Sequence, residues 1–253
     1  MPAAILARLV LLEARRSALP WLAAASLVAA LLAAAFLSAV ALTESRELRI
    51  AVVAALLRAC AVFLVAAQVA ASVRREIDDK GLEQMLSLPL PRAVHYLGRL
   101  AGFALCGAAL ALVFALALSA WAPLASLALW AVSLAAECAL VAAAALFFSM
   151  SLGSLVGAIS ATLSLYLLGR SMSAVQAIAA GPLADESLAG HLARGVVDGL
   201  AFILPRLDAV TRTEWLLYGA PGARDYAWGL AGLIGYAALL GAAGLFDFYR
   251  RAP

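Results

Sequence analysis

Charged side chains are scarce in this sequence. Of its 253 residues, 13% are charged and 66% are hydrophobic, and Lys80 is the only lysine. Soluble domains are about a quarter charged and about half apolar, so a compact soluble fold of this length could not bury this much apolar surface. A lipid bilayer, by contrast, solvates apolar side chains. The composition therefore excludes an ordinary soluble enzyme and predicts a single membrane domain that covers residues 1–253.

The residues that phosphate, metal and acid–base chemistry require are also few. No segment has the form Gly-x-x-x-x-Gly-Lys-Ser/Thr that binds nucleotide phosphates, and Lys80 precedes a glycine instead of following one. His95 and His191 are the only histidines, and they fall in different connections between apolar runs. We therefore expect no ATPase site, no metal site and no cofactor in this chain itself.

The small side chains in the apolar runs favour packing between helices. Cys60, Cys106 and Cys138 are odd in number and lack the spacing of metal ligands, so they are predicted to be small apolar fillers. Gly98 and Gly102 lie four residues apart at the start of one run. This spacing lets another helix approach the backbone closely.

Long apolar runs take up most of the chain. A helix that crosses a bilayer needs about 20 mostly apolar residues. We predict six transmembrane helices, at residues 18–42, 50–72, 99–121, 124–148, 152–168 and 227–246. The predicted fold class is therefore an all-α integral membrane protein. Residues 2–17 are predicted to form a short helix that lies at the membrane surface.

The net charge is small, at +3, and is carried almost entirely by arginine. Arginines that flank membrane helices account for this excess, so no nucleic-acid partner is expected. Six spans place both chain ends on the same side of the membrane. Arginine and lysine are more numerous in the segments on that side than in those on the opposite side. Because positively charged segments tend to remain in the cytoplasm, both termini are predicted to be cytoplasmic.

Three polar side chains interrupt the apolar runs. Arg58 and Gln68 fall in the second run, and Glu137 falls in the fourth. A charge inside a bilayer costs about 2.5–3.5 kcal/mol on insertion scales and therefore points to a role. In one interpretation Arg58 and Glu137 face the bundle interior, where they line a pathway or pair with each other. In the other, Arg58 extends toward the membrane surface, and Glu137 is protonated or makes a packing contact. Gln68 is interpreted as a packing hydrogen bond.

Two connections are long enough to carry structure. In the cytoplasmic one, residues 73–98, a charged run precedes apolar residues spaced to share one face of a short helix. Such a segment could dock a soluble partner or could be an ordinary solvated loop. The outer connection, residues 170–225, contains the apolar stretch 195–204. That stretch is too short to cross a membrane, which favours a re-entrant or interfacial helix.

Residues 76–92 read EIDDKGLEQMLSLPLPR. This segment resembles the coupling segment of the permeases of the second ABC export class. In that family a charged run leads through Gly-Thr, an acidic residue and a leucine-rich turn to Leu-Pro, a hydroxyl residue and arginine. The matching positions are Gly81, Glu83, Leu86, Leu88, Pro89 and Arg92. Leu82, Met85 and Pro91 depart from the pattern without changing its register, and the segment has the family's position between helices two and three of six.

A second stretch, residues 203–219, is similar to the outer connection of one branch of that family. This branch includes the permeases of copper-enzyme maturation and of gliding-type systems.

The resemblance implies a permease subunit of an ATP-driven exporter in a bacterial inner membrane, with no catalysis of its own. Two copies of the chain would form a homodimer within the lipid bilayer. Each copy would dock a separate ATP-binding-cassette subunit, which binds ATP and magnesium. ATP binding would close the ATPase pair and shift the permeases between inward- and outward-open states, with the outer segment as the exit gate. The residues implied at the ATPase contact are Glu76, Asp79, Gly81, Glu83, Leu86 and Pro89.

Two other functions fit the same composition. One is a membrane scaffold or assembly factor that transports nothing. The other is an integral membrane enzyme that modifies lipids with polar residues of the outer connection. Its candidate residues are Asp185, Glu186, His191 and Asp198. The sequence shows no tight acid–base or nucleophile cluster among them.

Overall fold

The computed structural model describes residues 2–40, 45–79, 91–179, 188–219 and 222–250. Within these ranges the chain is helical apart from short connections, and it forms no strand. Six of the helices are long and apolar enough to cross a membrane. They are α2 (Leu19–Val40), α3 (Ser45–Asp78), α5 (Arg92–Leu118), α6 (Leu124–Leu152), α7 (Leu155–Ala179) and α10 (Ala223–Arg250). In the described ranges this confirms the prediction of an all-α fold with six helices long and apolar enough to span a membrane.

Several helices extend beyond the predicted spans. The second span was predicted to end at residue 72, but α3 continues to Asp78. The fifth was predicted to end at residue 168, but α7 continues to Ala179 and includes Arg170. The predictions followed hydropathy, which falls where charges begin. Charged residues nevertheless propagate a helix as well as most apolar ones do, so the helices continue past these points.

The helix α6 is the centre of the bundle. It packs against α3, α5, α7 and α10, and most of its side chains are buried. Its contact with α5 is close because Gly107 has no side chain. A Cβ atom at Gly107 would lie 2.6 Å from the Cβ atom of Cys138. Cys106 and Cys138 are buried and Cys60 is half-buried, and all three are free thiols.

A two-residue break separates α6 from α7. Gly153 follows α6 with φ = 64°, the left-handed conformation that commonly ends helices and that glycine adopts without steric cost. The next residue, Ser154, accepts a hydrogen bond on Oγ from the backbone N–H of Gly157, at 3.1 Å. This bond caps the start of α7. The sequence Gly-Ser therefore ends one long helix and begins the next.

The first helix, α1 (Pro2–Arg16), packs against α5. A Cβ atom at Gly102 would lie 2.7 Å from that of Val10, and one at Gly98 would lie 3.0 Å from that of Leu6. The two glycines thus form the surface on which α1 rests, as their spacing predicted. Ser17 Oγ, at the bend between α1 and α2, donates a hydrogen bond to Gln68 Oε1 of α3, at 3.1 Å.

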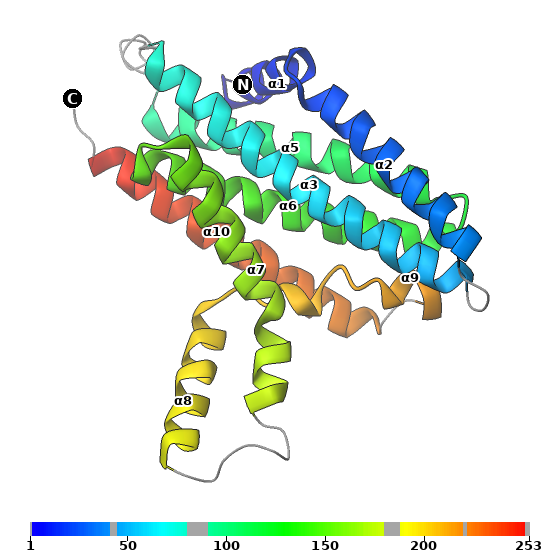
Figure 1. Ribbon diagram of the computed structural model, residues 1–253. Coiled ribbons are helices and arrows are strands. Elements are labelled where there is room, and N and C mark those ends of the chain that lie inside the picture. Colours follow the sequence, from blue (N-terminus) through cyan, green and yellow to red (C-terminus); the bar gives the residue numbers. More distant parts are fainter. Residues whose placement is uncertain (1, 41–44, 80–90, 180–187, 220–221, 251–253) are drawn as a thin grey trace.

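The bundle has two ends (Figure 1). The α1 end contains α1, the end of α3, the start of α5 and the end of α10, where Phe248 stacks on His95. At the opposite end lie the start of α3 and the short helix α9 (Glu214–Tyr218). We call this the α9 end. Both chain ends of the described structure therefore lie on the same side of the bundle.

The helix α8 (Leu188–Ile203) packs along the last part of α7 and projects from the bundle with it (Figure 1). It includes all but the last residue of the apolar stretch 195–204, which was predicted to be a re-entrant or interfacial helix. Several of its large apolar side chains are exposed, including Phe202 at 92%. After α8 the chain returns to the bundle through the short 3-10 helix η1 (Leu207–Ala209), which packs on α7.

We predict that Gly102→Ala lowers the free energy of unfolding by about 1–3 kcal/mol, because the added methyl group overpacks the α1–α5 contact. The control is Gly232→Ala in α10, where a Cβ atom would meet no other atom within 4 Å. Thermal unfolding of the purified protein in detergent measures both. Equal unfolding temperatures for the two variants would contradict the assignment of Gly102 as a contact surface.

Candidate functional site

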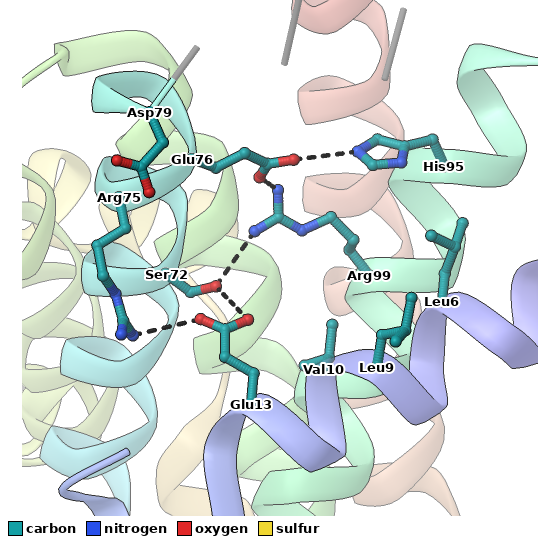
Figure 2. A pocket seen from close by; sticks show the side chains of 10 residues that line it. All are labelled: Leu6, Leu9, Val10, Glu13, Ser72, Arg75, Glu76, Asp79, His95 and Arg99. Carbon is teal, nitrogen blue, oxygen red and sulfur yellow. Dashed lines mark hydrogen bonds and ion pairs between the residues drawn. The ribbon is translucent and has the colours of Figure 1, made fainter. Parts of the chain in front are cut away.

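An ion network joins α3 to α5 at the α1 end, next to the predicted coupling segment (Figure 2). Glu76 of α3 forms an ion pair with Arg99 of α5, and Glu76 Oε1 also lies 3.6 Å from Nε2 of His95. The Arg99 and Glu76 side chains are only 8% and 14% exposed. Since the helices α3 and α5 flank residues 80–90, this pair fixes the two helices on either side of that segment to each other.

The same network reaches α1 through Glu13. The guanidinium group of Arg75 lies 3.2 Å from Glu13 Oε1, and Ser72 Oγ donates a hydrogen bond to Glu13 Oε2 at 3.1 Å. Arg99 Nη2 in turn donates to Ser72 Oγ at 3.3 Å. These residues surround a pocket of about 340 Å³ whose lining also includes Asp79 (Figure 2).

A further arginine ties the end of α3 to the α6–α7 break. Arg74 Nη1 donates a hydrogen bond of 2.8 Å to the carbonyl oxygen of Gly153, while the same side chain forms an ion pair of 2.8 Å with Asp78. The last two turns of α3 are therefore bonded to α1, to α5 and to the junction of α6 and α7.

Of the predicted ATPase-coupling residues, the structure describes two. Glu76 is half-buried in the network, and Asp79 is exposed at the rim of the pocket. The other four, Gly81, Glu83, Leu86 and Pro89, lie outside the described residues. The sequence did not identify Glu13, Ser72 or Arg99 as members of the network. These residues lie on three different helices, α1, α3 and α5, and no local pattern shows that they meet.

A second polar cluster lies inside the bundle, around Glu137 of α6. Glu137 is 0% exposed. Tyr166 of α7 donates a hydrogen bond to Glu137 Oε2 at 3.2 Å, and Arg170, one turn later on α7, lies 3.0 Å from Oε1. Both carboxylate oxygens therefore have a partner, which an ionised carboxylate away from water requires.

Arg170 also holds the chain that follows α8. Its Nη1 donates to the carbonyl oxygens of Leu207 at 2.7 Å and Val210 at 2.9 Å, and its Nη2 donates to that of Thr211 at 3.1 Å. The Thr211 carbonyl also accepts a hydrogen bond of 2.8 Å from Arg58 of α3. One guanidinium group thus joins α6 and α7 to residues 207–211, and Arg58 adds α3.

Thr211 has φ = 53°, a left-handed conformation that is unusual for a β-branched residue. Such a conformation costs about 1–3 kcal/mol and persists only where its surroundings hold it. Here the two arginines hold the Thr211 carbonyl oxygen. A Cβ atom at the neighbouring Gly169 would lie 2.7 Å from the carbonyl oxygen of Pro205, so the segment also requires a glycine on α7.

These contacts correct the prediction for the intramembrane charges in one respect. Arg58 and Glu137 both face the interior, but the ion-pair partner of Glu137 is Arg170. Sequence reasoning assigned Arg170 to the outer connection, because the fifth apolar run was taken to end at residue 168. The missed signal was the spacing of Tyr166 and Arg170, which places both on one face of a continuing helix. Gln68 is 8% exposed and accepts the bond from Ser17.

The residues proposed for a lipid-modifying enzyme do not form a cluster in the described structure. Asp198 accepts a hydrogen bond of 3.1 Å from Gln176 of α7, and His191 is exposed. Asp185 and Glu186 lie outside the described residues. No group of three or more His, Cys, Asp or Glu side chains in the described ranges could hold a metal ion.

Comparison with protein-family models and with curated proteins finds no match to this chain.

We predict that Arg170→Met lowers the free energy of unfolding by about 3–5 kcal/mol, because it leaves the buried Glu137 carboxylate without its charged partner. The matched control is Arg224→Met at the exposed start of α10, which should have little effect. Thermal unfolding in detergent compares the two. Similar losses of stability in both variants would show that the buried cluster does not hold the bundle together.

Proposed function

We propose that this chain is the transmembrane permease subunit of an ATP-driven ABC exporter, and that a separate ATP-binding subunit docks on residues 80–90. Three features support the proposal. Six helices can span a membrane. The sequence contains no phosphate-binding loop of its own. Residues 76–92 resemble the coupling segment of such permeases.

The observation that carries the proposal is the ion network at the base of this segment. The segment leaves α3 just after Glu76 and enters α5 just before His95 and Arg99, and these side chains join the two helices. A force applied to residues 80–90 by a closing ATPase would therefore act on both helices together. An ordinary solvated loop would need no such paired, largely buried charges at its base.

The contacts define a route for the movement. The end of α3 is bonded to α1 through Glu13 and to the α6–α7 junction through Arg74. A displacement of α3 would carry these helices with it, as a rigid-body or shear change of packed helices. Since α7 carries Arg170, tilting of α7 would also displace residues 207–211. In this proposal those residues and α8 belong to the exit gate.

The proposal extends to partners and location. Two copies of the chain would pair in a bacterial inner membrane, with α1 and both termini on the cytoplasmic side. ATP and magnesium would bind the docked subunits. Acidic side chains at Asp79 and Glu83 suit electrostatic docking of a basic partner surface, whereas Glu76 is paired with Arg99 at the base of the segment.

We expect Glu83→Arg to remove the partner ATPase from the complex, because it reverses a charge in the proposed docking surface. The tagged protein is purified from its native host in mild detergent, and ATPase activity is measured in the eluate. The matched control is Glu214→Arg, the same substitution at an exposed residue of the α9 end. If the wild-type eluate hydrolyses no ATP, the protein is a scaffold or a membrane enzyme. If Glu83→Arg retains the activity, residues 80–90 do not dock the ATPase.

A charge exchange tests the Glu76–Arg99 pair. The readout uses a Glu214→Cys variant that lacks the native cysteines. ATP should change the rate at which a membrane-impermeant maleimide labels position 214, because the proposed movement reaches the α9 end. Glu76→Gln should abolish that change without releasing the ATPase, because α3 and α5 no longer move together. The double variant Glu76→Arg with Arg99→Glu should restore it. A normal ATP response in Glu76→Gln would exclude the pair from the route of coupling.

A further inference from the structure

A groove of about 570 Å³ lies between α1, α2 and α5, apart from both polar clusters. Each helix contributes a leucine to its apolar lining: Leu11, Leu27 and Leu110 respectively. Its volume falls within the range of about 300–1,000 Å³ that small-ligand pockets have. It could hold an extended hydrocarbon chain, but not a further helix, which is about 10 Å across with its side chains.

The groove exists because α1 and α2 pack against different helices. Gly98 and Gly102 bring α1 against α5, whereas α2 packs mainly on α3. The bend at Ser17 lets the two helices diverge. The space between them is lined by small residues, such as Ala24 and Ala109, which leave it unfilled. Both alanines are exposed, so the groove opens onto the outer surface of the bundle.

Two positive charges stand at the edge of this groove. Arg8 and Arg15 are exposed and lie two turns apart on α1, so they share one face. Neither forms an ion pair or hydrogen bond with the described part of the chain. Glu13, the one acidic residue of α1, is engaged by Arg75 and Ser72. The groove thus combines an apolar interior with two arginines that have no acidic partner among the described residues.

We propose that this groove binds one anionic phospholipid from the surrounding bilayer. One acyl chain lies against the leucines of the three helices, and the phosphate group contacts Arg8 and Arg15. Basic pockets between membrane helices recognise anionic head groups in this way. An amphipathic helix such as α1 lies at the level of the head groups, which places its arginines beside the phosphates of the same leaflet.

The bound lipid would fill the space between α1 and α2 and fix the angle between them. This role is independent of the proposed transport function, since it depends only on helices that the structure describes. Its failure and the failure of the ATPase-docking proposal can be distinguished, because lipid binding is measured on the purified chain without nucleotide.

The test is native mass spectrometry of the detergent-purified protein, titrated with phosphatidylglycerol or with phosphatidylcholine of the same acyl chains. We expect one molecule of phosphatidylglycerol to bind in preference to phosphatidylcholine. Arg8→Gln and Arg15→Gln should each weaken this binding about fivefold. The matched control is Arg16→Gln, an exposed arginine next in sequence that does not line the groove.

A second pair of variants tests the apolar part. Ala109→Trp should fill the groove and abolish binding of the single lipid, whereas Leu112→Trp, on the exposed face of α5 outside the groove, should not. Equal binding of the two lipids would overturn the proposal. Unchanged lipid binding in Arg8→Gln, Arg15→Gln and Ala109→Trp would also overturn it. If Arg16→Gln weakens binding as much as Arg8→Gln and Arg15→Gln do, the lipid is attracted diffusely by the basic helix, and the proposal is likewise overturned.

Discussion

The guanidinium group of Arg170 joins parts of the chain that are far apart in sequence. It lies 3.0 Å from the carboxylate of Glu137 in α6, which is fully buried. Its remaining hydrogen bonds go to three backbone carbonyls of residues 207–211. Because an unpaired charge in a membrane interior costs several kcal/mol, these partners must stay together. The position of the segment after α8, and the left-handed conformation of Thr211, both follow from this requirement.

The two polar clusters share the same long helices. α3 carries Arg58 in the buried cluster and Glu76 in the ion network, 18 residues later, which corresponds to roughly 27 Å along a helix at 1.5 Å per residue. The helix α6 repeats this arrangement, since its Glu137 lies in one cluster, and Gly153, the residue after its end, is bonded to Arg74 at the other. Continuous helices therefore connect the two polar clusters.

The sequence predicted the six spans because hydropathy alone identifies them. An interior position for Arg58 and Glu137 was one of two interpretations, since a buried charge is costly, and the spacing of Gly98 and Gly102 indicated close helix packing. The sequence did not predict where helices end, because charges lower hydropathy without breaking a helix. Arg170 was missed for this reason. Arg99, Glu13 and Ser72 come from three separate helices, and no local pattern brings them together. The groove beside α1 likewise depends on the divergence of two helices and on alanines that look unremarkable in the sequence.

The packing of α1 on α5 has a consequence for the order of assembly. The apolar face of α1, with Val10 and Ala14 buried, rests on a helix that begins 76 residues after α1 ends, at Arg92. During synthesis α1 is therefore complete long before its binding surface exists. Because α1 is amphipathic, it can lie at the lipid–water boundary while α2 and α3 insert. The docking of α1 at this end of the bundle therefore cannot occur before α5 has been made.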